Sequence, residues 1–582
     1  MRLIKRDSFP VTLITIIVFI ACAWHIPQRT AIYLTGDEFS QYGIAAYLYG
    51  FDWRGAFHIG YYQFGFALLF IYPFFLIFGD NIQAVYQCSL VVNALIASSI
   101  VPLSYYILKQ WGMSSLIENK IYIPVILMVA LAGCTIAYSN LGLAEVLMIA
   151  IGFALTALVL KMQNTGATHR IVFLFAFLSV FGYACHMRFI GVLASGVIVF
   201  IVMVLTKRIK YIYLISFFLT LFTGIILSEF LKHYFQVNVW QINDIGILGS
   251  GDGNDITART SSAMNVLTFN GFKAFVRVLL GQLWYLGIAS FLFVYVGLCY
   301  LAKKFFIDSI SLIRKKSGID VDYSAVFILF GFLSTMIISG LGTYIFGDGN
   351  QNLIRADGLI YGRYNTLMFL PVSLYAAKII VEKKKDFSRN SIILYLIIIV
   401  LFIVQSSYIS LFFGHHYSLN QVMVFNVINF INFNSIVGNS TAAIFGFILV
   451  CIGSLIKEKD YILSAVLLVI VFFNIKAGFS FLSDHVIPAN KQYIEFNDLK
   501  EFRDLEEAYF IPNDSFLSVK IQMALPRTRV SSLYDINQLP DFNGTTLFIP
   551  TIYTDDIPFS NVLVFDDYET TENLAIIHRY SR

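Results

Sequence analysis

The sequence predicts an all-α polytopic membrane protein of about 13 transmembrane helices that ends in a small external α/β domain. Of its 582 residues, 58% are hydrophobic and 13% are charged, and the mean hydropathy is +0.73. Apolar stretches of roughly 17 to 25 residues recur through most of the chain, and a helix of that length crosses a bilayer core. From residue 483 onward the composition becomes polar.

The N-terminus pairs a basic flank, MRLIKRDSFP, with the apolar run VTLITIIVFIACAWHI. This order is typical of a signal sequence, but no small-x-small cleavage site follows it and further spans do, so we predict a retained signal anchor. The predicted spans cover residues 10–26, 84–108, 121–139, 143–160, 171–187, 189–206, 211–232, 277–302, 324–346, 365–381, 391–413, 440–456 and 461–479.

A further apolar run at 61–79, YYQFGFALLFIYPFFLIFG, decides the side of every later segment. If it crossed the membrane, most basic clusters would face outward, against the positive-inside rule. We therefore predict a helix that lies in the outer half of the membrane, with the N-terminus cytoplasmic and the C-terminal domain external or periplasmic. The basic clusters that then face the cytoplasm lie within 2–6, 109–120, 161–170, 207–210, 303–316, 383–389 and 457–459.

Two domains follow from this pattern. Residues 1–482 form a transmembrane module, whose first external loop at 27–83 carries juxtamembrane helices, and residues 483–582 form the external domain. Runs of β-favouring residues beside helix-prone residues fit an α/β fold for the external domain. Its predicted strands cover 515–524, 545–550 and 561–568, and its helix-prone stretch covers 491–508.

Charge and cysteine usage argue against several classes of protein. The net charge of +4 is spread over loops and gives no reason to expect nucleic acid as a partner. The sequence contains no GxxxxGK(S/T) motif, so an ATP-driven pump is not indicated. All six cysteines lie in apolar segments without a metal-ligand spacing, which argues against a disulfide framework.

Two adjacent acids, Asp37 and Glu38, follow the first span in YLTGDEFSQYGIAAYLYG. One interpretation is helix capping by Thr35 or Asp37. The capped segment would be an amphipathic surface helix whose aromatic residues rest at the membrane interface, namely Phe39, Tyr42, Tyr47 and Tyr49. The other is chemistry, because a carboxylate just outside the bilayer can act as a general base toward a hydroxyl or amine, or hold a divalent cation. Capping needs one acid, whereas a pair allows one residue to react while the second supports it.

Other charged residues gather on the same predicted face. Glu145 stands at the external mouth of a span, where it either caps a helix end in water or faces protein or a cation. Arg188, beside His186, occupies a tight external turn and either snorkels to headgroups or binds a phosphate with its planar fork. Arg355 and Arg363 frame RADGLIYGR just outside another span, at a depth suited to a lipid phosphate.

The order of these elements resembles the integral-membrane glycosyltransferases of the GT-C fold. Within that group the sequence looks most similar to the branch that depends on polyprenyl-phosphate sugars, which includes protein O-mannosyltransferases and the lipid A aminoarabinose transferase. The features that carry the resemblance are the external Asp-Glu pair, YYQFG at 61–65, FLIFGDN at 75–81, the long span ending at Lys109, Glu145, the Met187-Arg188 turn and GRY at 362–364.

The resemblance implies transfer of a sugar, with inversion, from a polyprenyl-phosphate donor to a glycan, lipid or protein acceptor. The reaction would take place at the external face of a plasma (inner) membrane, in glycan biosynthesis of the cell envelope. It implies Asp37 as the base with Glu38 in support, and Asp37 with Glu145 as ligands of a divalent cation such as Mg, Mn or Zn. The residues it places at the donor and its lipid phosphate are Arg188, Arg363, Arg355, His186 and Tyr61.

Three alternatives stay open at this stage. A transporter of lipid-linked glycans or polysaccharide would carry acids and arginines inside the membrane, whereas here they cluster at the outer face and paired halves are not obvious. A ligase or polymerase that moves whole lipid-linked glycans would share the external site. A catalytically inactive scaffold is the third alternative, and the Asp-Glu pair makes it less attractive.

Overall fold

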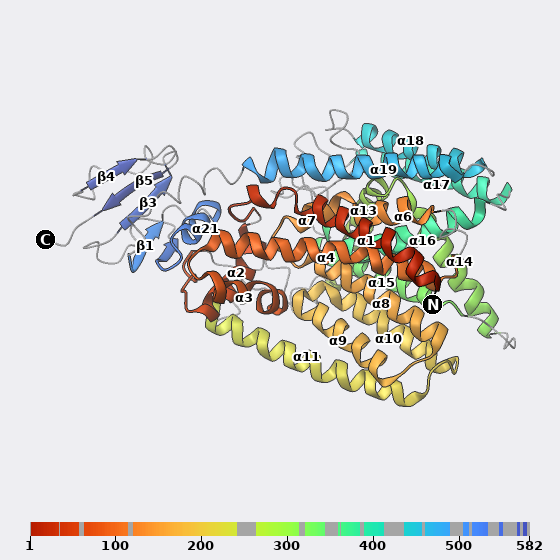
Figure 1. Ribbon diagram of the computed structural model, residues 1–582, viewed down its shortest axis with the longest axis horizontal. Helices are drawn as coiled ribbons and strands as arrows, with labels where there is room; N and C mark the ends of the chain where they lie inside the picture. The colour runs from red at the N-terminus through yellow and green to blue at the C-terminus, as the bar shows by residue number, and fades with distance from the viewer. Residues whose placement is uncertain are drawn as a thin grey trace.

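Long apolar helices that run side by side make up most of the molecule (Figure 1). The coordinates come from a computed structural model. The residues that it describes are 2–33, 35–56, 63–113, 120–240, 263–313, 321–343, 359–360, 362–384, 389–411, 436–456, 460–488, 505–510, 515–532, 546–550, 567–570 and 574–578.

The first half of the helical part contains α1 (Arg2–Ala23), α2 (Thr35–Tyr49), α3 (Tyr72–Phe78), α4 (Ile82–Gln110), α6 (Tyr122–Ala130), α7 (Gly133–Ser139), α8 (Glu145–Thr165), α9 (His169–Cys185), α10 (Ile190–Leu205) and α11 (Tyr211–Trp240). The second half contains α13 (Phe269–Ala289), α14 (Phe293–Ile313), α15 (Tyr323–Thr343), α16 (Thr366–Lys384), α17 (Arg389–Ser410), α18 (Ile436–Leu455) and α19 (Asp460–Phe481). Short helical turns are η1 (Ile26–Gln28), η2 (Ala67–Ile71), η3 (Met187–Phe189), η6 (Gly362–Asn365) and η9 (Leu482–Val486).

The predicted class, a polytopic helical membrane protein, is confirmed. In the described ranges, 11 helices are long and apolar enough to cross a membrane, or up to 12 if the bent pair α6 and α7 counts as one span. Two of the predicted spans account for the difference from thirteen. The span at 121–139 is the bent pair, and the span at 171–187 is α9, whose 17 residues fall short of the length required.

One predicted span, 277–302, is wrong as a continuous helix. The chain breaks between α13 and α14, where Phe291 and Leu292 adopt positive φ angles of 49° and 62°. A left-handed residue that is not glycine costs about 1–2 kcal/mol, and burial of both side chains offsets this cost. Phe291 packs against Gly446 of α18, so a tertiary contact fixes the break.

The apolar run at 61–79 forms a short helical segment, η2 followed by α3, that spans Ala67–Phe78. At about 1.5 Å per residue it reaches roughly 18 Å, which is too short for a bilayer core of about 30 Å. Pro73 stands at the start of α3, where a missing N–H costs little. The length agrees with the prediction that this run does not cross the membrane.

Burial differs strongly between helices. Most of α8 and α16 is buried, whereas α11 is mostly exposed and lies along one edge of the bundle, opposite α18 and α19 (Figure 1). A helix that is apolar all round is stable either inside a protein core or in lipid. We therefore assign α8 and α16 to the centre and α11 to the lipid boundary.

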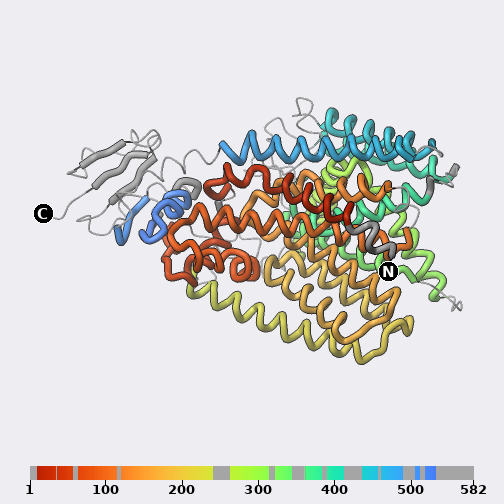
Figure 2. Tube along the Cα trace, viewed as in Figure 1, coloured from red at the N-terminus to blue at the C-terminus, as the bar shows by residue number. Residues whose placement is uncertain are grey.

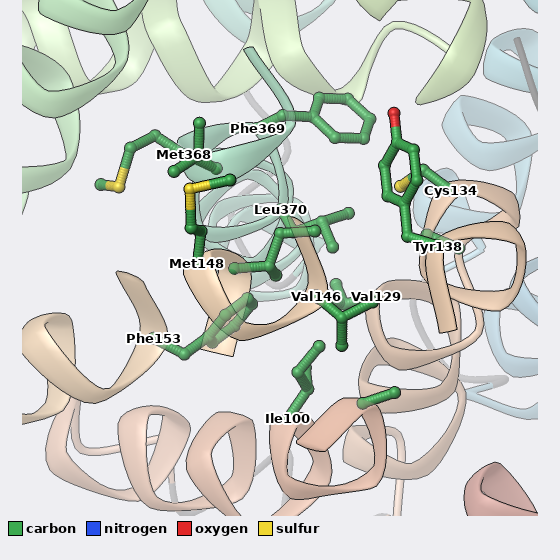
Figure 3. Packing of buried hydrophobic residues seen from close by; sticks show 14 of the residues in the cluster. Ile100, Val129, Cys134, Tyr138, Val146, Met148, Phe153, Met368, Phe369 and Leu370 are labelled. Carbon is green, nitrogen blue, oxygen red and sulfur yellow. The ribbon is translucent and has the colours of Figure 1, made fainter. Parts of the chain in front are cut away.

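The centre of the bundle is an apolar cluster of buried residues. Helix α8 packs there against α4, α15 and α16, helix α15 packs against α16, and α6 contacts α4 and α16. Close packing of this kind fixes the ends of the helices relative to one another, because a shift of one helix opens cavities along its whole length. Figure 3 shows the side chains that meet in this cluster, among them Ile100, Val129, Val146, Met148, Phe153, Met368, Phe369 and Leu370.

The C-terminal part contains a five-stranded sheet with the order β2-β1-β3-β5-β4. Strand β1 pairs in parallel with β2 and β3, while β5 pairs antiparallel with β3 and β4. The strands are β1 (Glu507–Phe510), β2 (Arg529–Ser532), β3 (Thr546–Pro550), β4 (Asp567–Thr570) and β5 (Leu574–His578). Together with helix α21 (Ser515–Ala524) they confirm a small α/β unit.

The strand predicted at 515–524 is wrong, because this segment is helix α21. Two parallel neighbours such as β1 and β2 need a crossover connection, and a helix supplies it. The strand at 545–550 is confirmed as β3. The helix-prone stretch lies mostly outside the described residues, and so does most of 561–568. The domain boundary after 482 stays a prediction.

Replacing Gly297 by alanine tests the packing of α14 against α16. A Cβ at this position would lie 2.6 Å from the main-chain oxygen of Val372, so one helix must move. We expect Gly297→Ala to lower stability by about 1–3 kcal/mol. The measurement is the thermal midpoint of the detergent-purified protein. Gly453→Ala is the matched control, because its Cβ would meet no atom closer than 3.4 Å, and an equal loss in both variants would contradict the assignment.

Candidate functional site

Charged residues from four separate segments meet at one end of the bundle. Asp37 lies in the first turn of α2, and Glu145 is the first residue of α8. Arg188 belongs to the turn η3 between α9 and α10, and Arg363 belongs to η6 just before α16. Each segment begins or ends a helix, so the helical packing described above determines how the four side chains lie.

Arg363 is the centre of the site. Its Nε donates to Glu145 Oε1 at 2.8 Å, its Nη2 donates to the same oxygen, and its Nη1 donates to Asp37 Oδ2. The Arg363 and Glu145 side chains are 4% and 3% exposed, whereas the Asp37 side chain is 28% exposed. Glu145 therefore fixes the guanidinium from the buried side, and Asp37 is the acid that an incoming molecule can reach.

The turn η6 holds Arg363 by local contacts. Thr366 Oγ1 donates to the main-chain oxygen of Arg363 at 2.9 Å. Gly362 lies so close to the ring of Tyr285 on α13 that a Cβ there would overlap it. The chain thus needs glycine before the arginine, and the GRY sequence presents the guanidinium toward α2 and α8.

Arg188 lies against the next residue of the same turn. The carbon at the centre of its guanidinium is 3.1 Å from the centroid of the Tyr364 ring, and the residue is 7% exposed. Its main-chain N–H donates to Nδ1 of His186, which caps η3 at 3.3 Å. Nε of Arg188 has no hydrogen-bond partner in the described part of the chain. A buried cation with a free donor is suited to an anion.

Glu38 faces the opposite way from Asp37 and is fully buried. Its Oε1 accepts from the main-chain N–H of Tyr33 at 2.8 Å. Its Oε2 accepts from Tyr86 Oη at 2.7 Å and from the main-chain N–H of Gly142 at 2.6 Å. Three donors satisfy a carboxylate well. These contacts favour a positioning role for Glu38, which joins α2 to α4 and to the turn before α8.

Arg29 is a site residue that the sequence analysis missed. It is fully buried, and it donates to Tyr86 Oη at 2.6 Å and to the main-chain oxygens of Asn140 and Val486 at 3.1 and 3.2 Å. Arg29 and Glu38 therefore share Tyr86 as a bridge. The sequence could have indicated Arg29, because an arginine just after the first span, on the external side, is an exception to the positive-inside pattern.

The predicted amphipathic surface helix is wrong for two of its four aromatic residues. Phe39 and Tyr42 of α2 are fully buried, so they do not rest at a membrane interface, whereas Tyr47 is half-buried and Tyr49 is 37% exposed. Tyr42 Oη hydrogen-bonds to Ser89 of α4. Burial raises the pKa of the Tyr42 phenol, and the Ser89 hydrogen bond acts in the opposite direction. Tyr42 is therefore a neutral packing residue rather than a base.

Two predicted donor residues, Tyr61 and Arg355, lie outside the described residues. Gln63, two positions after Tyr61, is 2% exposed, and neither its Oε1 nor its Nε2 has a partner within the described ranges. A Cβ on Gly65 would lie within 3.0 Å of Ala184, so this segment packs against the end of α9. Gln63 belongs to the YYQFG motif at 61–65, but the sequence analysis gave it no role.

The cation predicted between Asp37 and Glu145 stays a prediction. The guanidinium of Arg363 already bridges these two carboxylates, so a divalent cation there would have to displace it. Within the described residues, no three His, Cys, Asp or Glu side chains come together in a metal-binding group. In this arrangement the two carboxylates are paired with an arginine.

The fold defines a class of protein. It is the GT-C-like fold of integral-membrane proteins, as the sequence predicted. Two solved structures that share it are of ArnT from Cupriavidus metallidurans, one bound to undecaprenyl phosphate and one in the apo state. They are 9% and 10% identical to this chain with TM-scores of 0.53 and 0.51, and each comparison covers 98% of both chains. No family model and no curated protein matches the sequence.

Replacing Glu38 by glutamine tests whether this residue is structural. The amide group would turn a donor toward three groups that are themselves donors, so at least one of them loses its partner. We expect Glu38→Gln to destabilise the protein by about 1–3 kcal/mol, seen as a lower thermal midpoint. Glu507→Gln is the control, because the Glu507 side chain at the start of strand β1 is 52% exposed. An unchanged midpoint in Glu38→Gln would show that the buried network does not support the fold.

Proposed function

We propose that this protein is a glycosyltransferase that moves a sugar from a polyprenyl-phosphate donor to an acceptor, with Asp37 as the general base. The observation that carries the proposal is the contact of Arg363 with a buried Glu145 and an accessible Asp37. The likeness in fold to ArnT, which was crystallised with undecaprenyl phosphate, supports the choice of donor. The acceptor is a glycan, a lipid or a protein.

Exposure distinguishes Asp37 from the other two acids. Glu38 and Glu145 are 0% and 3% exposed, and their oxygens accept hydrogen bonds from Tyr86 and Arg363. A general base must come within hydrogen-bond reach of the proton that it removes. Asp37, at 28%, is the carboxylate of this group with access for an acceptor.

Two arginines are suited to the donor phosphate. Arg188 offers a buried guanidinium whose Nε is free to donate, and the Tyr364 ring keeps its plane in place. Arg363 is fixed by Glu145, and its Nη1 donates to the accessible Asp37, so its guanidinium adjoins the open side of the site. Guanidinium groups bind phosphate oxygens in a planar, bidentate way. His186 supports this site by capping the turn that carries Arg188.

The proposed step is a single displacement. The Asp37 carboxylate accepts the proton of the acceptor hydroxyl or amine, and the acceptor atom forms a bond to the anomeric carbon. The bond from that carbon to the phosphate oxygen breaks, and its electron pair leaves with the polyprenyl phosphate. Arg188 and Arg363 stabilise the charge that develops on this leaving group. Attack from the face opposite the phosphate inverts the configuration at the anomeric carbon.

We place the reaction on the external face of a plasma membrane. The N-terminal end of α1 and the C-terminal part of the chain lie toward opposite ends of the molecule (Figure 1). The site lies at the end where α1 leads into α2 and where α9 gives way to η3. With the basic clusters in the cytoplasm, this end is external.

Replacing Asp37 by asparagine tests the base. We expect Asp37→Asn to lower kcat by about 100-fold or more, because general-base catalysis contributes typically 10²–10⁴-fold, while the KM for the donor changes little. The measurement is release of polyprenyl phosphate from a panel of polyprenyl-phosphate sugars by the purified protein. Asp460→Asn, at the start of α19, is the control. Full transfer by Asp37→Asn would exclude this residue as the base.

Replacing Arg188 by glutamine tests the phosphate site. We expect Arg188→Gln to weaken binding of polyprenyl phosphate by about tenfold or more, since a charged hydrogen bond is worth about 1.5–3 kcal/mol. Binding is measured by thermal shift of the protein against carrier phosphate. Arg170→Gln is the control, because Arg170 lies exposed near the start of α9. Equal affinities would remove Arg188 from the donor site.

The transporter alternative gives a different result in the same assay. A transporter moves an intact lipid-linked glycan between leaflets without breaking the bond to phosphate. Release of carrier phosphate together with an acceptor that gains one sugar supports the transferase. Movement of intact lipid without bond cleavage, in proteoliposomes that contain the purified protein, would overturn it.

A further inference from the structure

The C-terminal domain is seated on the first loop of the transmembrane module. Trp53 Nε1 donates to the main-chain oxygen of Pro526 at 3.0 Å, and the residue is 2% exposed. Ser518 Oγ of α21 donates to the main-chain oxygen of Ala56 at 2.7 Å, and this bond is also buried. Figure 2 shows the blue trace of α21 beside the red trace that contains α2.

The loop around Gly55 also contacts strand β2 of the C-terminal domain, by close packing and by an ion pair. A Cβ on Gly55 would lie 2.7 Å from both the main-chain oxygen of Val530 and Oγ of Ser531, so the loop touches strand β2 without a gap. The Arg54 side chain holds the pKa of Asp52 below its usual range, chiefly through their hydrogen bonds. Arg529 of β2 lies 3.7 Å from the same carboxylate. The loop and the C-terminal domain are therefore in close contact, with complementary charges across the contact.

The other side of Trp53 contacts helix α2. Its ring is stacked on Phe39, with the centroids 5.5 Å apart and the planes at 8°. Phe75 of α3 meets the same indole edge-on at 6.1 Å. Phe39 is fully buried and stands two residues after Asp37 in the first turns of α2. One indole thus joins the C-terminal domain to the helix that carries the proposed base.

We propose that Trp53 is a positioning residue, through which the docked C-terminal domain holds the start of α2 and so places Asp37 against Arg363. The inference rests on the proposed function. Glu38 fixes this turn from the side of α4, and the Phe39–Trp53 stack fixes it from the side of the C-terminal domain. Asp37 directly precedes these two anchored residues in α2. The C-terminal domain is then part of the active module, rather than only a module for capturing acceptors.

Two Trp53 variants test the proposal in the full-length protein. A displacement of about 1 Å of a reacting group can cost about 100-fold in rate, so we expect Trp53→Ala to lower kcat by about tenfold or more with the donor KM unchanged. Trp53→Phe keeps an aromatic ring on Phe39 but loses the hydrogen bond to Pro526. We expect its kcat to lie between that of the wild-type protein and that of Trp53→Ala. Trp24→Ala, at a tryptophan that is 63% exposed, is the matched control.

Gly55→Ala tests the same link from the side of the C-terminal domain. The added methyl collides with the main chain of β2 and pushes the domain away from the loop, while Trp53 itself is retained. We expect a loss of kcat in the same direction as in Trp53→Ala. Gly453→Ala serves as the control. If either Trp53→Ala or Gly55→Ala raised only the acceptor KM, the domain would be an acceptor-binding module and the proposal would be wrong.

A substrate-free readout separates this proposal from the proposed function. Asp37→Cys is made in the otherwise wild-type protein and is combined, one at a time, with Trp53→Ala, Trp53→Phe and Gly55→Ala. The rate at which a water-soluble maleimide modifies Cys at position 37 is then followed by mass spectrometry of its peptide. We expect Trp53→Ala and Gly55→Ala to change the rate severalfold. Unchanged rates would overturn the positioning role, whereas wild-type protein that releases no carrier phosphate would overturn the proposed function alone.

Discussion

Arg363 is 4% exposed and joins two carboxylates from different helices, the accessible Asp37 of α2 and the buried Glu145 of α8. A buried charge is tolerated when it is paired, and removing one partner leaves the others with the full cost of desolvation. In a chain that is 58% hydrophobic this constraint is severe. The first turn of α2, the start of α8 and the turn before α16 must therefore converge, and the packing of α4, α8 and α16 serves that geometry.

A second buried network stands directly behind the first. Successive residues of a helix point about 100° apart, so Asp37 faces Arg363 while Glu38 faces Tyr86 and, through it, Arg29. Asp37 thus contacts the site, whereas Glu38 attaches the first turn of α2 to α4 and to the turn before α8. The accessible acid is held in place by its inaccessible neighbour, whose partners are main-chain N–H groups and a tyrosine.

Much of this arrangement could be predicted from the sequence, because hydropathy identifies membrane helices and charge bias assigns their ends to one face. Asp37, Glu145, Arg188 and Arg363 were therefore expected near each other, and they meet at one end of the bundle. Local pattern could not reveal which atoms pair. The break at Phe291 depends on packing against α18, and alternation at 515–524 resembles a strand because α21 is buried on several sides.

The partners of Arg29 set an order on assembly. Its hydrogen bond to the main-chain oxygen of Val486 spans 457 positions along the chain, and Val486 lies just beyond α19, the last long helix described. Translation runs from the N-terminus, so the arginine emerges beside the first membrane segment long before this acceptor has been synthesised. The bond from Arg29 to Val486 can therefore form only after α19 has been synthesised, whereas its partners Tyr86 and Asn140 are made much earlier. Completion of the hydrogen bonds around Arg29 is a late event in biogenesis, and a nascent chain interrupted before residue 486 is left with an incompletely satisfied cation next to the bilayer.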